Sequence, residues 1–123
     1  MANGLLLPTS LKIQNKFMDN ILATLEQILE QRKSASADSS YVSSLYNKGT
    51  DQILKKIAEE SAEVIMATKE GESDKIIYEV ADLWFHTMIL LRHQNIAFSD
   101  IEEELMRRYG VSGLTEKLNR TIK

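Results

Sequence analysis

The chain has 123 residues, of which 43% are hydrophobic and 27% charged, so its composition is that of one folded globular domain and not of a disordered segment. It contains no cysteine, which excludes disulfides and thiolate metal sites and favours a cytoplasmic location. The formal net charge of −3 argues against a nucleic-acid-binding surface. No apolar run reaches the ~18 residues that a membrane span needs, so we expect the protein to bind neither nucleic acid nor a membrane.

The N-terminal third is predicted to contain a tail, one helix and a polar linker. We assign residues 1–16 to the tail and residues 17–123 to a single domain. Apolar residues recur at helical spacing between Phe17 and Arg32, which predicts the first helix. The linker over 34–40 is small and polar, and an apolar anchor over 41–46 then leads to a point where a loop meets a helix.

Two long helices are predicted in the middle of the chain. Thr50 is the expected N-cap of a helix that runs to Glu70 and stops at Gly71. Ser73 restarts the chain, and the segment 76–93 is apolar on most of its circumference. We therefore expect this third helix to be buried on several sides at the centre of the core.

The C-terminal part is predicted to be helical as well. Ser99 and Glu102 form a capping box that opens a fourth helix, and Gly110 marks its end. A short last helix is expected over 112–120. With no alternating strand pattern, the fold class is all-α, a small helical bundle. Because four short helices cannot easily cover the apolar third helix, we expect the bundle to be completed by dimerisation into a homodimer or a higher homo-oligomer.

Acidic residues follow an EExxE pattern on the second helix and an ExxD pattern on the third. The five acids are Glu59, Glu60, Glu63, Glu79 and Asp82. At about 100° per residue, Glu60 borders the apolar stripe of its helix, and Lys56 and Glu63 lie further round on the same side. Glu59 points further towards solvent or towards a position behind the groups that bind the metal.

This excess of acids over nearby cations predicts a bound divalent metal ion. Carboxylates beside a core need basic partners or a metal, and an all-oxygen ligand set suits Mg²⁺ or Mn²⁺ together with a phosphate-bearing substrate. A di-iron site would need Glu-x-x-His pairs, but Leu83 and Leu90 stand three residues before His86 and His93. We leave both histidines outside the metal set, as hydrogen-bonded structural residues.

A glycine between Lys48 and Thr50 is compatible with a phosphate contact. Backbone N–H groups at a helix N-terminus can dock an anion that a lysine neutralises. The same three residues are equally compatible with an ordinary turn.

The text of the chain resembles one family closely. The EExxE and ExxD pair is similar to the all-α nucleoside triphosphate pyrophosphatases, the MazG-like group. The segments 39–64, 79–91 and 112–120 read SSYVSSLYNKGTDQILKKIAEESAEV, EVADLWFHTMILL and SGLTEKLNR, and they narrow the resemblance to the phosphoribosyl-ATP pyrophosphatases of histidine biosynthesis.

This resemblance implies Mg²⁺-dependent hydrolysis of phosphoribosyl-ATP to phosphoribosyl-AMP and pyrophosphate. It implies metal binding by Glu60, Glu63, Glu79 and Asp82, and catalytic roles for Glu59 and Glu60. It also implies phosphate contacts from Lys48, Thr50 and Lys56. Trp84-Phe85 replaces the Leu-Tyr that is common in the family after the ExxD aspartate. This replacement removes a hydroxyl, so no role of that tyrosine is transferred.

Two other functions are compatible with the same residues. The first is a MazG-like pyrophosphatase that cleaves free or modified nucleoside triphosphates. The second is a helical interaction module without enzyme activity, in which the acids keep one face solvated.

Overall fold

The computed structural model describes residues 21–110 and residue 120, and all elements within this part of the chain are helical. They are the α-helices α2 (Ile21–Gln31), α3 (Tyr41–Lys48), α4 (Thr50–Glu70), α5 (Ser73–His93) and α6 (Phe98–Tyr109), with the 3₁₀ turn η1 (Ala37–Ser39). The all-α prediction is therefore confirmed. The predicted tail over 1–16, the start of the first helix at 17–20 and, except for Arg120, the predicted last helix lie outside the described residues.

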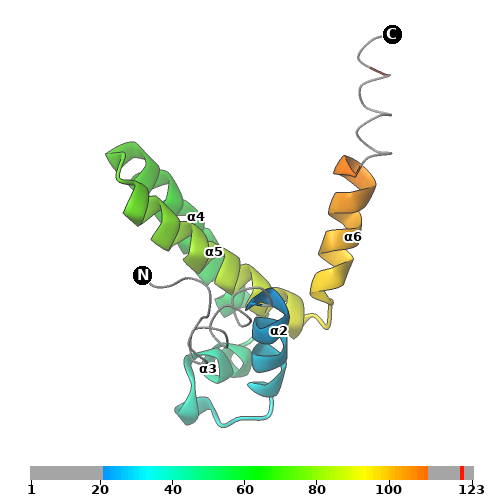
Figure 1. Ribbon diagram of the computed structural model, residues 1–123. Coiled ribbons are helices and arrows are strands. Elements are labelled where there is room, and N and C mark those ends of the chain that lie inside the picture. The colour runs from blue at the N-terminus through cyan, green and yellow to red at the C-terminus, as the bar shows by residue number, and fades with distance from the viewer. Residues whose placement is uncertain (1–20, 111–119, 121–123) are drawn as a thin grey trace, which may run out of the picture.

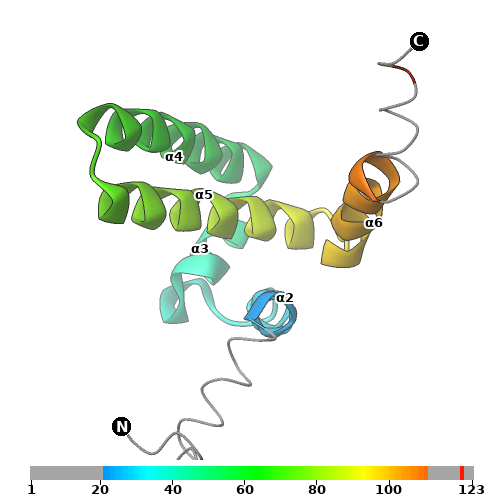
Figure 2. The same cartoon turned by 45° about the horizontal axis from the view of Figure 1, so that its top comes forward.

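Helices α4 and α5 form an antiparallel hairpin that dominates the molecule (Figure 1, Figure 2). Gly71 ends α4 in the left-handed region at φ 81°, and its N–H lies 3.2 Å from the carbonyl oxygen of Ala67 and 3.1 Å from that of Thr68. This is the conformation that glycine adopts without strain. Only Gly71 and Glu72 separate the two helices. The chain therefore reverses direction directly, and the two acidic motifs face each other.

Helix α3 was not predicted as a helix, because eight residues with one apolar side give a weak periodic signal. It begins where the Ser40 hydroxyl accepts a hydrogen bond from the Ser43 N–H at 3.0 Å. Gly49 ends it at φ 99°, donating its N–H to the Leu45 carbonyl at 3.0 Å, and the same glycine is the N-cap of α4. Thr50 is therefore the first residue of α4, and the prediction that it is the N-cap is wrong by one position.

The core lies at one end of the hairpin. Each of the five α-helices contributes to it: its buried side chains are Leu29, Val42, Leu45, Ile53, Ile89 and Phe98. Helices α2 and α3 gather at this end, as Figure 1 shows. Within residues 21–110, no helix covers the opposite end of α4 and α5 in this way, and Ile65, Met66, Ile77 and Tyr78 are exposed there. The prediction that α5 is buried on several sides therefore does not hold among the described residues.

An arginine joins three helices on the other side of the core. The Arg92 guanidinium on α5 lies 3.3 Å from a Glu26 carboxylate oxygen and 2.7 Å from one of Glu30, both on α2. Glu26 also accepts the N–H of Phe98, the first residue of α6, at 2.9 Å. The Glu26 carboxylate thus pairs with the Arg92 guanidinium and also accepts a hydrogen bond from a backbone N–H at the start of α6, where a helix offers no acceptor of its own.

Helix α6 projects away from the hairpin (Figure 1, Figure 2). Its cap residue is Ala97, two positions before the predicted Ser99, and the Asp100 carboxylate accepts a hydrogen bond from the Ala97 N–H at 3.3 Å. Its side chains Ile101, Leu105, Met106 and Tyr109 are exposed.

No helix in the described residues is long and apolar enough to cross a membrane.

Candidate active site

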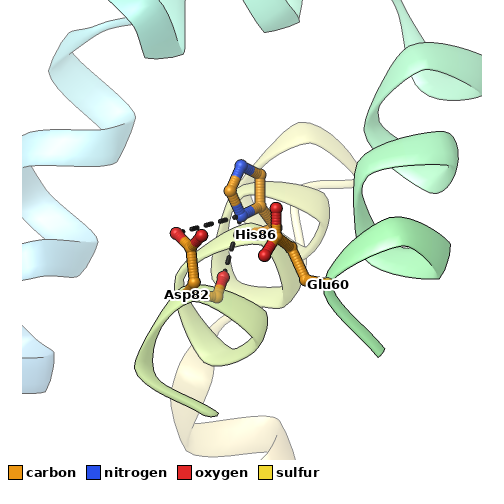
Figure 3. A group of neighbouring side chains, drawn as sticks. All are labelled: Glu60, Asp82 and His86. Atoms are coloured by element: carbon orange, nitrogen blue, oxygen red, sulfur yellow. Dashed lines mark hydrogen bonds and ion pairs between the residues drawn. The ribbon is translucent and has the colours of Figure 1, made fainter. Parts of the chain in front are cut away.

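Three side chains converge between α4 and α5. Glu60 on α4 and Asp82 and His86 on α5 each bring one potential ligand atom into a group whose members lie within 4.8 Å of one another. Figure 3 shows the two carboxylates facing each other beside the imidazole ring. Glu60 and His86 are buried, with 7% and 3% of their surface exposed, whereas Asp82 is half-buried. This Glu60–Asp82–His86 cluster is open to solvent on the aspartate side.

The electrostatics of the cluster favour neutralisation of its acids. Burial, then hydrogen bonding and charge repulsion from Asp82, raise the pKa of Glu60 above its usual value of 4.5, and Lys56 opposes this rise. Two carboxylates this close cannot both ionise without cost. A proton or a cation between them removes the repulsion.

Lys56 lies beside the cluster, one turn earlier on α4. Its ammonium is 3.5 Å from Glu60 and 3.4 Å from Glu59. Glu59 is exposed, so it pairs with Lys56 at the rim while Glu60 points inward. The predicted orientations of Glu59, Glu60 and Lys56 around the helix are those found.

The acids Glu63 and Glu79 lie one helical turn further along the hairpin. Both line a surface groove of about 400 Å³ between α4 and α5. Lys75 also lines this groove, but its ammonium lies 2.7 Å from Glu70 and 3.7 Å from Glu72. Glu63 and Glu79 are thus a second pair of acidic residues next to Glu60 and Asp82.

Lys48 and Thr50 flank Gly49 at the junction of α3 and α4. The Thr50 hydroxyl is 3.2 Å from Nε2 of His93. Thr50 is ten residues before Glu60, which corresponds to about 15 Å along an α-helix. The junction is therefore a separate region from the acids, about three helical turns before Glu60 on α4.

Sequence reasoning leaves two residues of this region out of the candidate site. It places His86 on the polar stripe of its helix as a hydrogen-bonded structural residue, and both ring nitrogens have a hydrogen-bond partner. Tyr41, whose hydroxyl lies 2.6 Å from His86 Nε2, was assigned only to an apolar anchor. In the sequence, Tyr41 looks like an ordinary aromatic core residue. Its contact partner His86 lies 45 positions later in the chain, so no local sequence pattern identifies this contact.

The donors fit a hard divalent cation. Glu60 and Asp82 offer carboxylate oxygens on facing helices, the adjacent acids Glu63 and Glu79 add negative charge, and Asp82 leaves a solvent-accessible side where water and a phosphate oxygen can bind. Mg²⁺ and Mn²⁺ take such oxygen sets and retain several waters.

Comparison with known proteins identifies the family. The profile of the family described as phosphoribosyl-ATP pyrophosphohydrolase matches residues 22–109. Proteins named phosphoribosyl-ATP pyrophosphatase are similar over 103 residues, which are 84% of this chain and 98% of each relative: one from Vesicomyosocius okutanii is 74% identical and one from Ruthia magnifica is 70% identical. A relative of the same name from Hydrogenovibrio crunogenus is 52% identical over 107 residues, 84% of this chain and 95% of that protein. The chain therefore belongs to the phosphoribosyl-ATP pyrophosphohydrolase family of hydrolases.

Proposed function

We propose that this protein hydrolyses phosphoribosyl-ATP to phosphoribosyl-AMP and pyrophosphate, the second step of histidine biosynthesis, with Mg²⁺ as its metal. The observation that supports this most directly is the facing pair Glu60 and Asp82, with the Lys56 ammonium 3.5 Å from Glu60. Family membership supports phosphoribosyl-ATP as the substrate. The two carboxylates offer ligands for the metal ion that a triphosphate requires. We place the reaction in the cytoplasm, consistent with a chain that lacks cysteine.

Glu60 and Asp82 would hold the metal, and Glu63 and Glu79 would complete the acidic surroundings one turn along the hairpin. When bound, Mg²⁺ supplies charge neutralisation of the triphosphate and a lower pKa for a coordinated water. Mn²⁺ meets the same ligand requirements and should replace it.

The chain's own side chains would then orient and stabilise the reacting groups. Glu59 or Glu60 accepts a hydrogen bond from the attacking water and receives its proton. The water oxygen bonds to the α phosphorus while the bond from that phosphorus to the α–β bridging oxygen breaks, so that pyrophosphate leaves with the bridging oxygen. Lys56 lies beside both glutamates, where an ammonium offsets negative charge that develops on the departing pyrophosphate.

Lys48 and Thr50 would bind a different part of the substrate. Thr50 lies about 15 Å from Glu60 along α4, and Lys48 ends the preceding helix, so the α3–α4 junction is too far away to contact the phosphate that reacts. Phosphoribosyl-ATP also carries a phosphate on its second ribose, and the α3–α4 junction would neutralise that group.

The test is release of pyrophosphate by the purified protein with phosphoribosyl-ATP and Mg²⁺. Asp82→Asn and Glu63→Gln should each lower turnover by orders of magnitude, whereas Glu102→Gln, which changes an exposed acid on α6, should not. Circular dichroism checks that the helices survive.

Competing substrates separate this proposal from its alternatives. ATP and deoxynucleoside triphosphates cleaved as fast as phosphoribosyl-ATP would indicate a general nucleotide pyrophosphatase of the MazG-like group. Failure to release pyrophosphate from any of them in the presence of metal would leave the non-enzymatic helical module.

A further inference from the structure

His93, the last residue of α5, links three helices at the α3–α4 junction. Its Nε2 lies 3.2 Å from the hydroxyl oxygen of Thr50, the first residue of α4. Its ring stacks on the ring of Tyr46 from α3, with the centroids 5.7 Å apart and an interplanar angle of 11°. These two contacts determine where the imidazole lies and which of its nitrogens meets Thr50.

The Tyr46 ring beneath His93 is itself held in place. Its hydroxyl donates a hydrogen bond to the main-chain carbonyl oxygen of Leu29 at 2.9 Å, and its side chain packs against the core. Burial raises the pKa of Tyr46 to about 12, so this hydroxyl keeps its proton at neutral pH. The imidazole of His93 therefore lies on a side chain that is anchored to the core, and it presents Nε2 to Thr50 from a fixed position.

The contact with His93 limits how Thr50 can bind a phosphate. A threonine hydroxyl has one proton to donate and two lone pairs that accept, whereas a dianionic phosphate monoester has only acceptors. A Thr50 hydroxyl that binds such a phosphate must therefore donate to it, which leaves only its lone pairs for His93. Nε2 is then the donor. In the opposite arrangement Thr50 donates to Nε2 and has no proton left for the substrate.

We propose that His93 is a positioning residue that makes the protein selective for a substrate with a second phosphate. Its Nε2–H donates to the Thr50 hydroxyl oxygen and so directs the hydroxyl proton towards the phosphate on the second ribose of phosphoribosyl-ATP, beside Lys48. This inference rests on the proposed function, in which Lys48 and Thr50 bind that phosphate, and it adds the residue that orients Thr50. ATP lacks the second ribose and its phosphate, so His93 should contribute to the binding of phosphoribosyl-ATP and not to that of ATP.

Two substitutions separate the hydrogen bond of His93 from its ring stack. His93→Phe keeps a ring that can stack on Tyr46 and removes both nitrogens, whereas His93→Gln removes the ring and keeps an N–H donor. His93→Phe should raise the KM for phosphoribosyl-ATP about tenfold, and His93→Gln should stay within about threefold of wild type. Because the junction lies about 15 Å from Glu60 along α4, kcat should change little in either variant. The reverse order of the two KM values would show that only the ring matters and would overturn the proposal.

ATP is the matched control ligand, because it carries the triphosphate without the second ribosyl phosphate. Its inhibition constant against phosphoribosyl-ATP should be the same in wild type and in His93→Phe. An equal loss of affinity for both ligands would indicate a general structural role and would overturn the proposal. In the Thr50→Val background, His93→Phe should raise KM no further, and an undiminished rise would show that His93 does not act through Thr50.

Ribose 5-phosphate tests the role of His93 separately from the proposed reaction. Its affinity, measured by titration calorimetry, should fall about tenfold in His93→Phe and much less in His93→Gln. Failure of the wild type to bind it, or equal affinity of wild type and His93→Phe, would overturn the proposal.

Nitrogen-15 NMR of the wild-type complex with ribose 5-phosphate does not depend on how well a variant folds. It should show a proton on Nε2 of His93, and a lone pair there would contradict the inference. A protein that binds ribose 5-phosphate in this way but releases no pyrophosphate from phosphoribosyl-ATP would refute the proposed reaction while supporting the role of His93.

Discussion

Glu60 combines burial with a facing carboxylate, and this makes its ionisation costly in the metal-free protein. Its pKa is raised from 4.5 by burial first and by Asp82 second. Between pH 4.5 and the raised pKa, the folded state binds more protons at this position than the unfolded state. The contribution of Glu60 to stability is therefore largest below pH 4.5 and falls as the pH rises through this window.

Glu60→Gln should raise the stability of the metal-free protein at pH 7, because an amide carries no charge to desolvate. A gain on the order of 1 kcal/mol corresponds to a rise in Tm of about 4 °C for a chain of this size. Thermal melts at pH 4 and pH 7 provide the measurement, with Glu59→Gln at the exposed neighbouring position as the control. The difference between wild type and Glu60→Gln should shrink at pH 4 and when Mg²⁺ is added, and a difference that is independent of pH would contradict the assigned cause.

Lys56 is the cation nearest the buried acid, and its replacement tests the predicted phosphate contact. Lys56→Ala should lower kcat/KM by about 10- to 100-fold, as expected for a lost charge-assisted hydrogen bond. A loss mainly in kcat would indicate contact with the transition state, and a loss mainly in KM would indicate substrate holding alone. Lys55→Ala, at the exposed adjacent position, is the control, and equal kinetics of the two variants would remove Lys56 from the site.

The two glycines at the ends of α4 have different backbone conformations, so they provide a prediction at the scale of elements. Gly71 occupies the left-handed region, and Gly49, at φ 99° and ψ −177°, lies in a region that is essentially restricted to glycine. An added Cβ would meet no atom within 4 Å at either position, so any cost arises from the backbone alone.

Gly71→Ala should cost about 1 kcal/mol of unfolding free energy, and Gly49→Ala about 2 kcal/mol. Urea denaturation measures both. Gly49→Ala should in addition raise KM, because it displaces Lys48 and Thr50, whereas Gly71→Ala should not. Unchanged KM in a folded Gly49→Ala protein would argue against a phosphate contact at the α3–α4 junction.

The sequence predicts the long helices better than the short one, for a physical reason. Helices α4 and α5 repeat their apolar pattern over 21 residues each and end at recognisable signals such as Gly71. Helix α3 has eight residues, and its existence depends on the Ser40 cap and on packing against the core. The start of α6 depends on Asp100 and on Glu26 from a distant helix, which a local capping rule for Ser99 does not include.

The same distinction between local patterns and tertiary contacts applies to the candidate site. Helical spacing correctly groups Glu60 with Lys56 and places Asp82 and His86 on one stripe, because these relations lie within single helices. The contact of Tyr41 with His86 joins two helices across 45 positions, so only the tertiary structure could show it.

At the scale of the whole molecule, exposed apolar side chains on α5 and α6 favour association. Ile77, Tyr78 and Trp84 are 66%, 69% and 59% exposed in the single chain, and α6 adds further apolar residues. We predict that the working unit is at least a dimer that covers these surfaces. Dilution from micromolar to nanomolar concentration should lower Tm and specific activity together, as measured by calorimetry and by light scattering. A fully active 14.0 kDa monomer at micromolar concentration would disprove this prediction.

The two-residue turn between α4 and α5 also has a consequence for folding kinetics. Glu60 and Asp82 are only 22 positions apart in sequence, and the helices that carry them are joined by a short connection, so their meeting requires the closure of a small loop. Chains dominated by such local contacts fold in microseconds to milliseconds. In refolding, the hairpin should therefore form early and bring both carboxylates together before distant contacts such as that of Glu26 with the first residue of α6 are made.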